Sequence, residues 1–151
     1  VTLGTLDGAN VEIAQLVGEE NIYTFGQHSD AVIKMYAGEG DKAPDGRSYH
    51  PLSFYHRPAV EPLVDFLVSP ELLAIGDPAE LSALWKDMKN KDWFMALLDV
   101  EDYIAAKDRA VRDYGDRRAW AKKMLVNIAK SGYFSSDRTI QQYNEDIWKL
   151  N

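Results

Sequence analysis

The sequence contains no cysteine among its 151 residues. It therefore offers no disulfide framework, zinc ribbon or thiolate chemistry, and a reducing, cytoplasmic setting is expected. It also lacks an apolar run long enough to span a bilayer, so we expect no membrane insertion. Its 17 lysines and arginines are outnumbered by 24 aspartates and glutamates, which gives a formal net charge of −7. Because nucleic-acid binding needs clustered basic side chains, no nucleic-acid partner is expected.

The basic residues and histidines that are present form no evident site. The nearest approach to a basic patch alternates with apolar positions, which indicates the solvated side of a helix: Arg117, Arg118, Lys122 and Lys123. The histidines are dispersed in loop-like sequence without metal-ligand spacing, and we expect them at the surface: His28, His50 and His56. The early glycines match neither a dinucleotide fingerprint nor a P-loop, so phosphate binding there is only a weak hypothesis: Gly4, Gly8 and Gly18.

The first residues of the sequence predict a strand, a helix and a second strand. Residues 1–5 have neither an initiator methionine nor a signal-peptide layout, so an internal cut in a longer protein is expected. They form an apolar, β-branched run followed by the turn Leu6-Asp7-Gly8. A helix ending at Gly18 and a strand over 21–25 follow. This order is typical of a parallel sheet, which needs more strands than these two.

The remainder is predicted to be helical apart from one loop. A short helix over 30–37 precedes a loop over 38–51, and everything after residue 58 has helical periodicity. Asp77-Pro78-Ala79-Glu80 predicts a helix start, and Ser135-Ser136-Asp137 predicts the start of the last helix. One of these helices should end at Gly115.

Apolar stripes along these helices predict buried faces. The first two stripes lie over 60–67 and 81–88, and the last lies over 140–148. A further stripe, on the helix before Gly115, contains Val100, Tyr103, Ile104, Val111 and Tyr114. The strongest stripe must lie against a core: Trp120, Ala121, Met124, Leu125, Ile128 and Ala129.

Two sets of residues could suggest chemistry, but simpler interpretations are favoured. The adjacent acids of the pairs Glu19-Glu20 and Glu101-Asp102 would point in different directions on a helix, so we interpret them as solvated. The four tryptophans could form a sugar-stacking platform, but each lies on or beside an apolar stripe, where core packing is favoured: Trp85, Trp93, Trp120 and Trp148. From the residues alone, the chain is a mostly helical piece with no visible active site.

Two longer stretches carry a family resemblance. Residues 2–12, Thr-Leu-Gly-Thr-Leu-Asp-Gly-Ala-Asn-Val-Glu, resemble the segment that follows the cofactor lysine of α-glucan (glycogen, starch or maltodextrin) phosphorylases. Residues 134–143, Phe-Ser-Ser-Asp-Arg-Thr-Ile-Gln-Gln-Tyr, together with Ile147-Trp148, resemble the closing helix of that family. Residues 18–26 and 127–132 are also similar, whereas 38–82 are less distinctive. The resemblance spans essentially the whole chain.

The resemblance implies an α/β, mostly helical fold that forms the C-terminal part of the second Rossmann-like domain of a GT-B fold. About two strands and six to eight helices are expected. In this interpretation residues 1–151 are a partial C-terminal domain, with a βαβ-like start over 1–37 and a helical part over 58–151. The closing helix, 136–149, would connect back to the N-terminal domain, and residues 2–5 with the turn 7–10 would hold the cofactor lysine in register.

The resemblance also implies a function for the parent enzyme, which is reversible phosphorolysis of α-1,4-glucans by orthophosphate to give glucose 1-phosphate. Pyridoxal phosphate would be the cofactor, and its phosphate would relay a proton. In the family pattern its lysine and phosphate-binding segments precede Val1, so no catalytic, cofactor-binding or metal-binding residue is assigned to this chain. The chain alone is expected to bind no cofactor and to be inactive.

One alternative from another class remains, a non-enzymatic helical interaction or scaffold module. In either case the apolar stripes exceed the surfaces that can cover them, so a homodimer or self-association is expected.

Overall fold

The computed structural model describes residues 1–43 and 45–150; Pro44, in the predicted loop, and Asn151, at the end of the predicted helical part, lie outside this description. The strands β1 (Leu3–Thr5) and β2 (Tyr23–Phe25) pair in parallel, with Leu3 opposite Tyr23. Between them lie α1 (Gly8–Val17) and the short 3-10 turn η1 (Glu19–Asn21). The predicted strand–helix–strand order is therefore confirmed.

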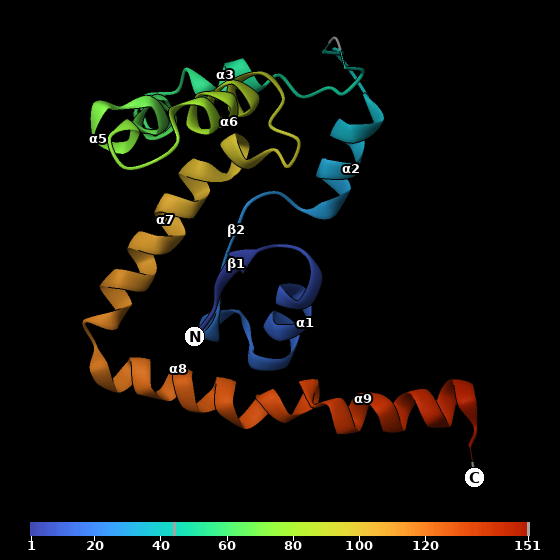
Figure 1. Cartoon of the computed structure of the whole chain (residues 1–151). Coiled ribbons are helices and arrows are strands. Elements are labelled where there is room, and N and C mark those ends of the chain that lie inside the picture. Colours follow the sequence, from blue (N-terminus) through green and yellow to red (C-terminus); the bar gives the residue numbers. More distant parts are fainter. Residues whose placement is uncertain (44, 151) are drawn as a thin grey trace.

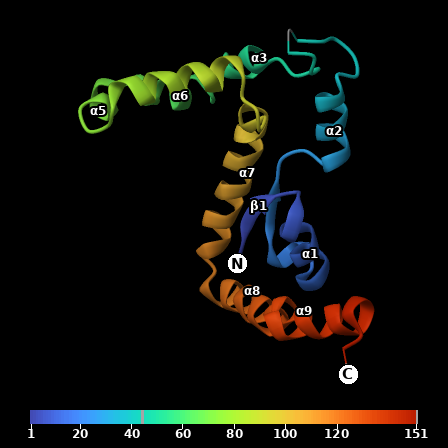
Figure 2. The same cartoon turned by 45° about the vertical axis from the view of Figure 1, so that its right-hand side comes forward.

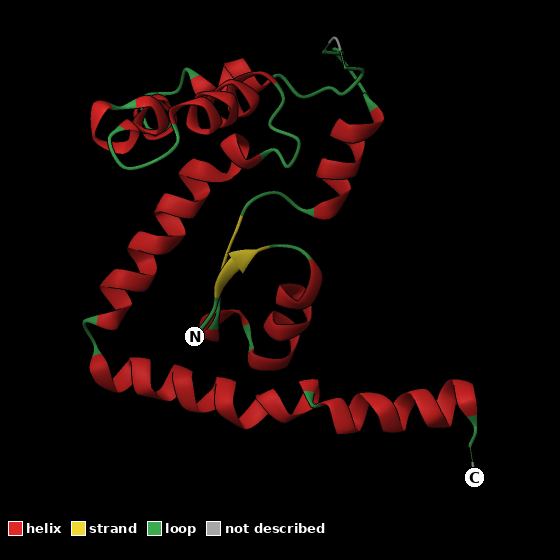
Figure 3. Cartoon of the chain, in the orientation of Figure 1, coloured by secondary structure: helices red, strands yellow, loops and turns green. Residues whose placement is uncertain are grey.

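The other described elements are all helical (Figure 3). In chain order they are α2 (Ser29–Ala37), α3 (Pro51–Tyr55), α4 (Glu61–Asp65), η2 (Phe66–Val68), α5 (Pro70–Leu73), α6 (Pro78–Asn90), α7 (Ala96–Tyr114), α8 (Arg117–Lys130), η3 (Ser131–Phe134), α9 (Ser136–Tyr143) and the π-helical turn η4 (Asn144–Trp148). Six of the described helices have eight residues or more, and this number agrees with the six to eight helices expected. Among the described residues, no helix has both the length and the apolar content needed to cross a membrane.

Local sequence signals explain most helix ends. Asp77 Oδ1 accepts hydrogen bonds from the amides of Ala79 and Glu80, and Ser135 Oγ accepts one from the amide of Arg138, as predicted. The helical pattern predicted over 60–67 is matched by α4 and η2, which follow one another directly and end before Ser69. Ser69 is extended (ψ 151°), since the following Pro70 disfavours a helical conformation at this position.

The elements are arranged around α7, which connects two groups (Figures 1 and 2). At one end, α3, α4, α6 and the start of α7 enclose the core cluster of Tyr55, Val60, Val64 and Leu97. At the other end, α7 packs along the sheet: Phe25 meets Tyr103 edge to face at 5.3 Å, and the Tyr23 hydroxyl donates to Asp113 at 2.6 Å. α7 therefore fixes the sheet relative to the helical group.

The stripe on α8 does not lie against a core, and this expectation was wrong. No residue of α8 is buried, and Leu125 and Ile128 are 65% and 67% exposed. The reason is that α1, η1 and the Tyr23 ring of β2 cover only one side of this helix. α9 projects away from the sheet and from α7 in both views (Figures 1 and 2), and the predicted stripe on it is also exposed. On α7, the predicted stripe residues Tyr103, Val111 and Tyr114 are exposed as well.

Candidate functional site

A pocket of about 640 Å³ lies at the carboxyl edge of the sheet, and we call it the sheet-edge pocket. The ends of β1 and β2 contribute Thr5 and Phe25, and α2 and the first turns of α7 close the sides. Carboxyl ends of parallel strands meet at one edge, which is where α/β sheets usually bind ligands. The pocket is therefore the candidate functional site that the fold itself creates.

The sheet-edge pocket combines aromatic walls with negative charge. Its aromatic rings are those of Phe25, Tyr36, Phe94 and Tyr103. Its charged lining residues are Asp7 and Asp99, and no lysine, arginine or histidine is among the lining residues that the structure describes. Such a site is unsuited to an anion, because no positive charge or basic donor would compensate it.

Asp7 and Asp99 are held differently. Asp7 Oδ1 accepts a hydrogen bond from Thr5 Oγ1 at 2.8 Å. Asp99 packs against the end of β2, where the absent side chain of Gly26 leaves it space; a Cβ there would lie 2.8 Å from Asp99 Oδ2. Burial raises the pKa of Asp99, a hydrogen bond from the Gln27 backbone opposes this, and nearby carboxylates raise the pKa further. Asp99 Oδ1 is buried and accepts no hydrogen bond from the described residues.

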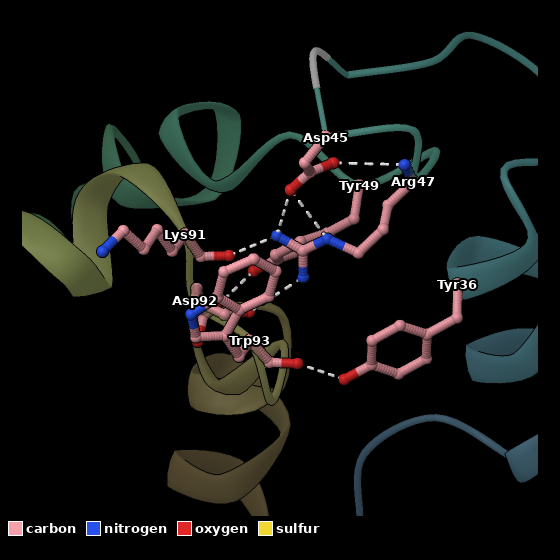
Figure 4. Close-up of polar contacts among 7 residues, drawn as sticks. All are labelled: Tyr36, Asp45, Arg47, Tyr49, Lys91, Asp92 and Trp93. Carbon is pink, nitrogen blue, oxygen red and sulfur yellow. Dashed lines mark hydrogen bonds and ion pairs between the residues drawn. The ribbon is translucent and has the colours of Figure 1, made fainter.

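A second polar cluster surrounds the buried side chain of Arg47 (Figure 4). Arg47 Nε and Nη2 donate to Asp45 Oδ2 at 2.9 and 2.7 Å, and Nη1 donates to the Asp92 carbonyl oxygen at 3.3 Å. Arg47 also donates to the Lys91 carbonyl oxygen, and its guanidinium lies 4.9 Å from the centre of the Trp93 ring. The hydrogen bonds from Arg47 lower the pKa of Asp45.

The carboxylate of Asp92 completes this cluster. Its oxygens accept hydrogen bonds from the Tyr49 hydroxyl at 2.5 Å and from the amides of Ala96 and Leu97, each at 2.9 Å. Burial, followed by the hydrogen bond to Asp92, raises the pKa of Tyr49. Because the Arg47 charge is paired with Asp45 and the Asp92 carboxylate is hydrogen-bonded, the Arg47 cluster connects residues 45–49 to the start of α7.

The histidines and acidic pairs that were considered as possible sites in the sequence are dispersed in the structure. His28 and His56 are exposed and His50 is half-buried, and no group of three potential metal ligands occurs among residues 1–43 and 45–150. The Glu19-Glu20 pair is exposed, and so is Glu101-Asp102, where Glu101 pairs with Arg57 at 2.6 Å.

Two of these interpretations need correction. Lys123 is not on a solvated face, because its side chain is only 19% exposed and its Nζ lies 5.4 Å from the centre of the Tyr23 ring. Trp85 packs against the core and Trp120 stacks on Tyr23. Trp93 and Trp148, however, are about half exposed: Trp93 lies beside Arg47, and Trp148 stacks on Tyr143 of the adjoining helix.

Sequence reasoning missed the residues of the sheet-edge pocket. One signal was available: Asp99 is an acid within the apolar run Leu97-Leu98-Asp99-Val100, where burial of an unpaired carboxylate is costly. The periodicity of the sequence does not show that Asp7 and Tyr36 lie near Asp99. The three residues come from the turn after β1, from α2 and from α7, which meet only in the folded chain.

A family model described as carbohydrate phosphorylase matches residues 1–150. The chain belongs to the carbohydrate phosphorylase family. It is 58% identical to a maltodextrin phosphorylase of Streptococcus pneumoniae over 151 residues, which are 100% of this chain and 19% of that protein. Identity is 37% to the Bacillus subtilis glycogen phosphorylase, over 99% of this chain and 18% of that protein. The chain is also 37% identical to the human muscle-form glycogen phosphorylase, over 98% of this chain and 16% of that protein.

The resemblance seen in residues 2–12 and 134–143 is thereby confirmed over the whole chain. The chain spans less than a fifth of the length of these curated phosphorylase relatives. The sheet-edge pocket is therefore a site on one segment of a phosphorylase fold.

Proposed function

We propose that this chain is a supporting segment of an α-glucan phosphorylase that uses orthophosphate to convert α-1,4-glucans reversibly into glucose 1-phosphate. The observation that carries this proposal is the identity of 58% with a maltodextrin phosphorylase along all of the chain but only 19% of that protein. The described residues supply architecture, whereas the chemistry belongs to the remainder of the enzyme.

The sheet supports a place in a larger α/β domain. β1 and β2 are the strands of the described residues, and a parallel sheet of two strands is too small to be stable alone. We assign them to the second Rossmann-like domain of a GT-B fold, in a cytoplasmic enzyme. Gly4 of β1 lies close to the first turn of α1: Gly4 has no side chain, and a Cβ there would lie 2.5 Å from Asn10 Nδ2. This close packing supports a positioning role for residues 2–10.

Pyridoxal phosphate, which the family implies, does not fit the groups that this chain presents. None of the described residues that line the sheet-edge pocket is a lysine that could form the covalent link, and the carboxylates of Asp7 and Asp99 would repel its phosphate. The cofactor would instead be held by parts of the phosphorylase outside this chain. The segment contributes no step through the cofactor.

A chimera tests the proposal. Residues 1–151 replace the matching residues of the Streptococcus pneumoniae maltodextrin phosphorylase, and glucose 1-phosphate release from maltodextrin and orthophosphate is measured. We expect activity within about tenfold of that enzyme, a loss of about 1.4 kcal/mol or less. The full chain alone should release none. A folded chimera without activity would instead favour the helical scaffold module.

Substitutions in the same chimera test the positioning role. Gly4→Val should lower the activity, because the added side chain forces the Asn10 side chain out of its packed position. Gly132→Ala is the matched control, since a Cβ at Gly132 meets nothing within 4 Å. Equal activities of the two variants would contradict a positioning role for the first turn.

A further inference from the structure

The sheet-edge pocket contains negative charge without a compensating positive charge. The charged groups that act on Asp99 are all carboxylates: Asp102 and Asp92 from the region of α7, and Asp7 from the turn after β1. No basic side chain is among the described residues that line the pocket. The charged form of a half-buried carboxylate near other acids is unfavourable, and either protonation or a cation that joins it relieves this cost.

The hydrogen bonding of Asp99 is also incomplete. Buried carboxylate oxygens nearly always accept a hydrogen bond, but Oδ1 of Asp99 has no donor among the described residues. This contrasts with Asp92, seven positions earlier, which accepts three hydrogen bonds through its carboxylate. Since Asp99 lines the pocket, a donor that enters the pocket can reach its carboxylate.

The walls of the pocket suit an organic cation rather than a metal ion. Phe25 and Tyr103 pack edge to face, and Tyr36 and Phe94 add two further rings. The faces of aromatic rings attract guanidinium and ammonium groups. A metal ion would need several oxygen ligands, and the described residues contain no group of three potential ligands.

The rim of the pocket indicates that the cation is carried by a polypeptide. Phe94 is 90% exposed and Ile33 is 63% exposed. A small free cation would leave these side chains in water, whereas a protein segment would cover them. The matched relatives contain more than four fifths of their length outside the region that this chain covers, so such a segment exists in a complete phosphorylase.

We propose that the sheet-edge pocket receives an arginine or lysine side chain from a segment of the phosphorylase outside these 151 residues, which pairs with Asp99. The inference rests on the proposed function, because it requires the chain to be part of a larger enzyme. The pairing would dock that segment against the carboxyl edge of the sheet. It would also give the Asp99 carboxylate a hydrogen-bond donor in addition to the Gln27 backbone, where Oδ1 has none among the described residues.

The first experiment measures binding of a single basic side chain to the full chain. N-acetyl-arginine methylamide is the probe, its neutral citrulline analogue is the control, and saturation-transfer difference NMR detects binding. We expect the arginine probe to bind at millimolar concentration and the citrulline analogue not to bind. Equal binding of the two probes would overturn the proposal, because charge would then play no part.

Variants locate the site. Asp99→Asn should weaken binding of the arginine probe by about tenfold or more, as loss of a hydrogen bond to a charged group does. Asp108→Asn is the control, since it removes an exposed acid of the same helix that neither lines the pocket nor is among the charged groups acting on Asp99. An equal loss in both variants would overturn the proposal. In the unmodified chain, lowering the pH should abolish binding as Asp99 becomes protonated, which provides a test that needs no variant.

The second experiment distinguishes a polypeptide from a free small cation. In the chimera with the Streptococcus pneumoniae enzyme, the pocket should already be filled, so the arginine probe should not bind. Binding as tight as to the full chain alone would identify a free small cation as the occupant and overturn the proposal. These results do not depend on catalysis: an inactive chimera that excludes the probe would refute the proposed function but leave the docking inference standing.

Discussion

At the scale of single residues, the molecule repeatedly uses a tyrosine hydroxyl that donates to an aspartate. The pairs Tyr23–Asp113, Tyr49–Asp92 and Tyr55–Asp65 have oxygen–oxygen distances of 2.6, 2.5 and 2.6 Å. In each, the hydrogen bond and burial raise the pKa of the tyrosine, to about 12 for Tyr23 and Tyr55. Two of these pairs lie outside the apolar core cluster, since they join β2 to α7 and Tyr49 to the segment before α7, whereas Tyr55 belongs to that cluster. Polar contacts therefore connect elements both inside and outside the apolar core.

Asp92 should be the most sensitive of these aspartates. Asp92→Ala leaves the Tyr49 hydroxyl and the amides of Ala96 and Leu97 without their acceptor. Since each buried unsatisfied group costs about 1–3 kcal/mol, we expect the free energy of unfolding to fall by at least about 3 kcal/mol. Urea denaturation measures this change. Asp87→Ala, which removes only an exposed ion pair with Lys91, should cost less than about 1 kcal/mol; similar losses would contradict the assignment.

Asp65 should make stability depend on acid pH. Hydrogen bonds from Tyr55 and then from Trp85 lower its pKa below the ordinary value of 3.8. A lowered pKa in the folded state means that the stabilisation is complete above the unfolded-state value and is lost as the pH falls through the folded-state value. Between about pH 5 and pH 2, the melting temperature should therefore fall more steeply for the unmodified chain than for Asp65→Asn.

Circular dichroism at a series of pH values measures this difference, and Tyr55→Phe serves as the intermediate case. That variant removes one of the two donors and keeps the other, Trp85. Parallel pH curves for the unmodified chain and Asp65→Asn would show that the carboxylate is not stabilised in the folded state.

At the scale of elements, the sequence predicts features that depend on neighbouring residues, such as helix ends. It does not predict features that depend on which elements come into contact, such as the burial of a helix face. The caps at Asp77 and Ser135 and the strand–helix–strand start follow from residues within one or two turns, and the structure contains them. The apolar stripe from Trp120 to Ala129 predicts a helix correctly, but periodicity cannot say whether another element covers the stripe. Contacts across long separations, such as that of Arg47 with Asp92, have no local signal. The sheet-edge pocket was missed for the same reason.

Substitution of Gly38 tests whether a glycine is required to end α2. It ends α2 in a left-handed conformation, with φ 72° and ψ 36°. A Cβ there would also overlap the carbonyl oxygen of Gly46. Gly38→Ala should therefore lower the free energy of unfolding by about 2 kcal/mol. Gly132→Ala should change it by less than about 0.5 kcal/mol, because Gly132 has open space and no positive φ. Urea denaturation compares the two, and equal effects would count against this account of the helix end.

At the scale of the whole molecule, the fold is an open frame (Figure 1). α7 connects a small helical core with a two-stranded sheet, and α8 and α9 extend beyond both (Figure 2). Apolar side chains along α8, α9 and η4, including Ile128, Ile140 and Ile147, are more than half exposed. This arrangement is understandable for a chain that spans less than a fifth of its relatives, where further protein can cover these faces.

The isolated chain should therefore self-associate through α8 and the helical end formed by α9 and η4. Exposed apolar surface of this extent favours association, because burying it releases the water around it. We expect the sedimentation coefficient to rise with protein concentration. The double variant Ile128→Lys with Ile147→Lys should sediment as a monomer. Gln15→Lys with Gln141→Lys adds the same two positive charges at exposed polar positions, and it should associate like the unmodified chain. A monomeric unmodified chain at all concentrations would mean that these helices cover their own apolar faces in solution; loss of association in both double variants would assign the effect to net charge.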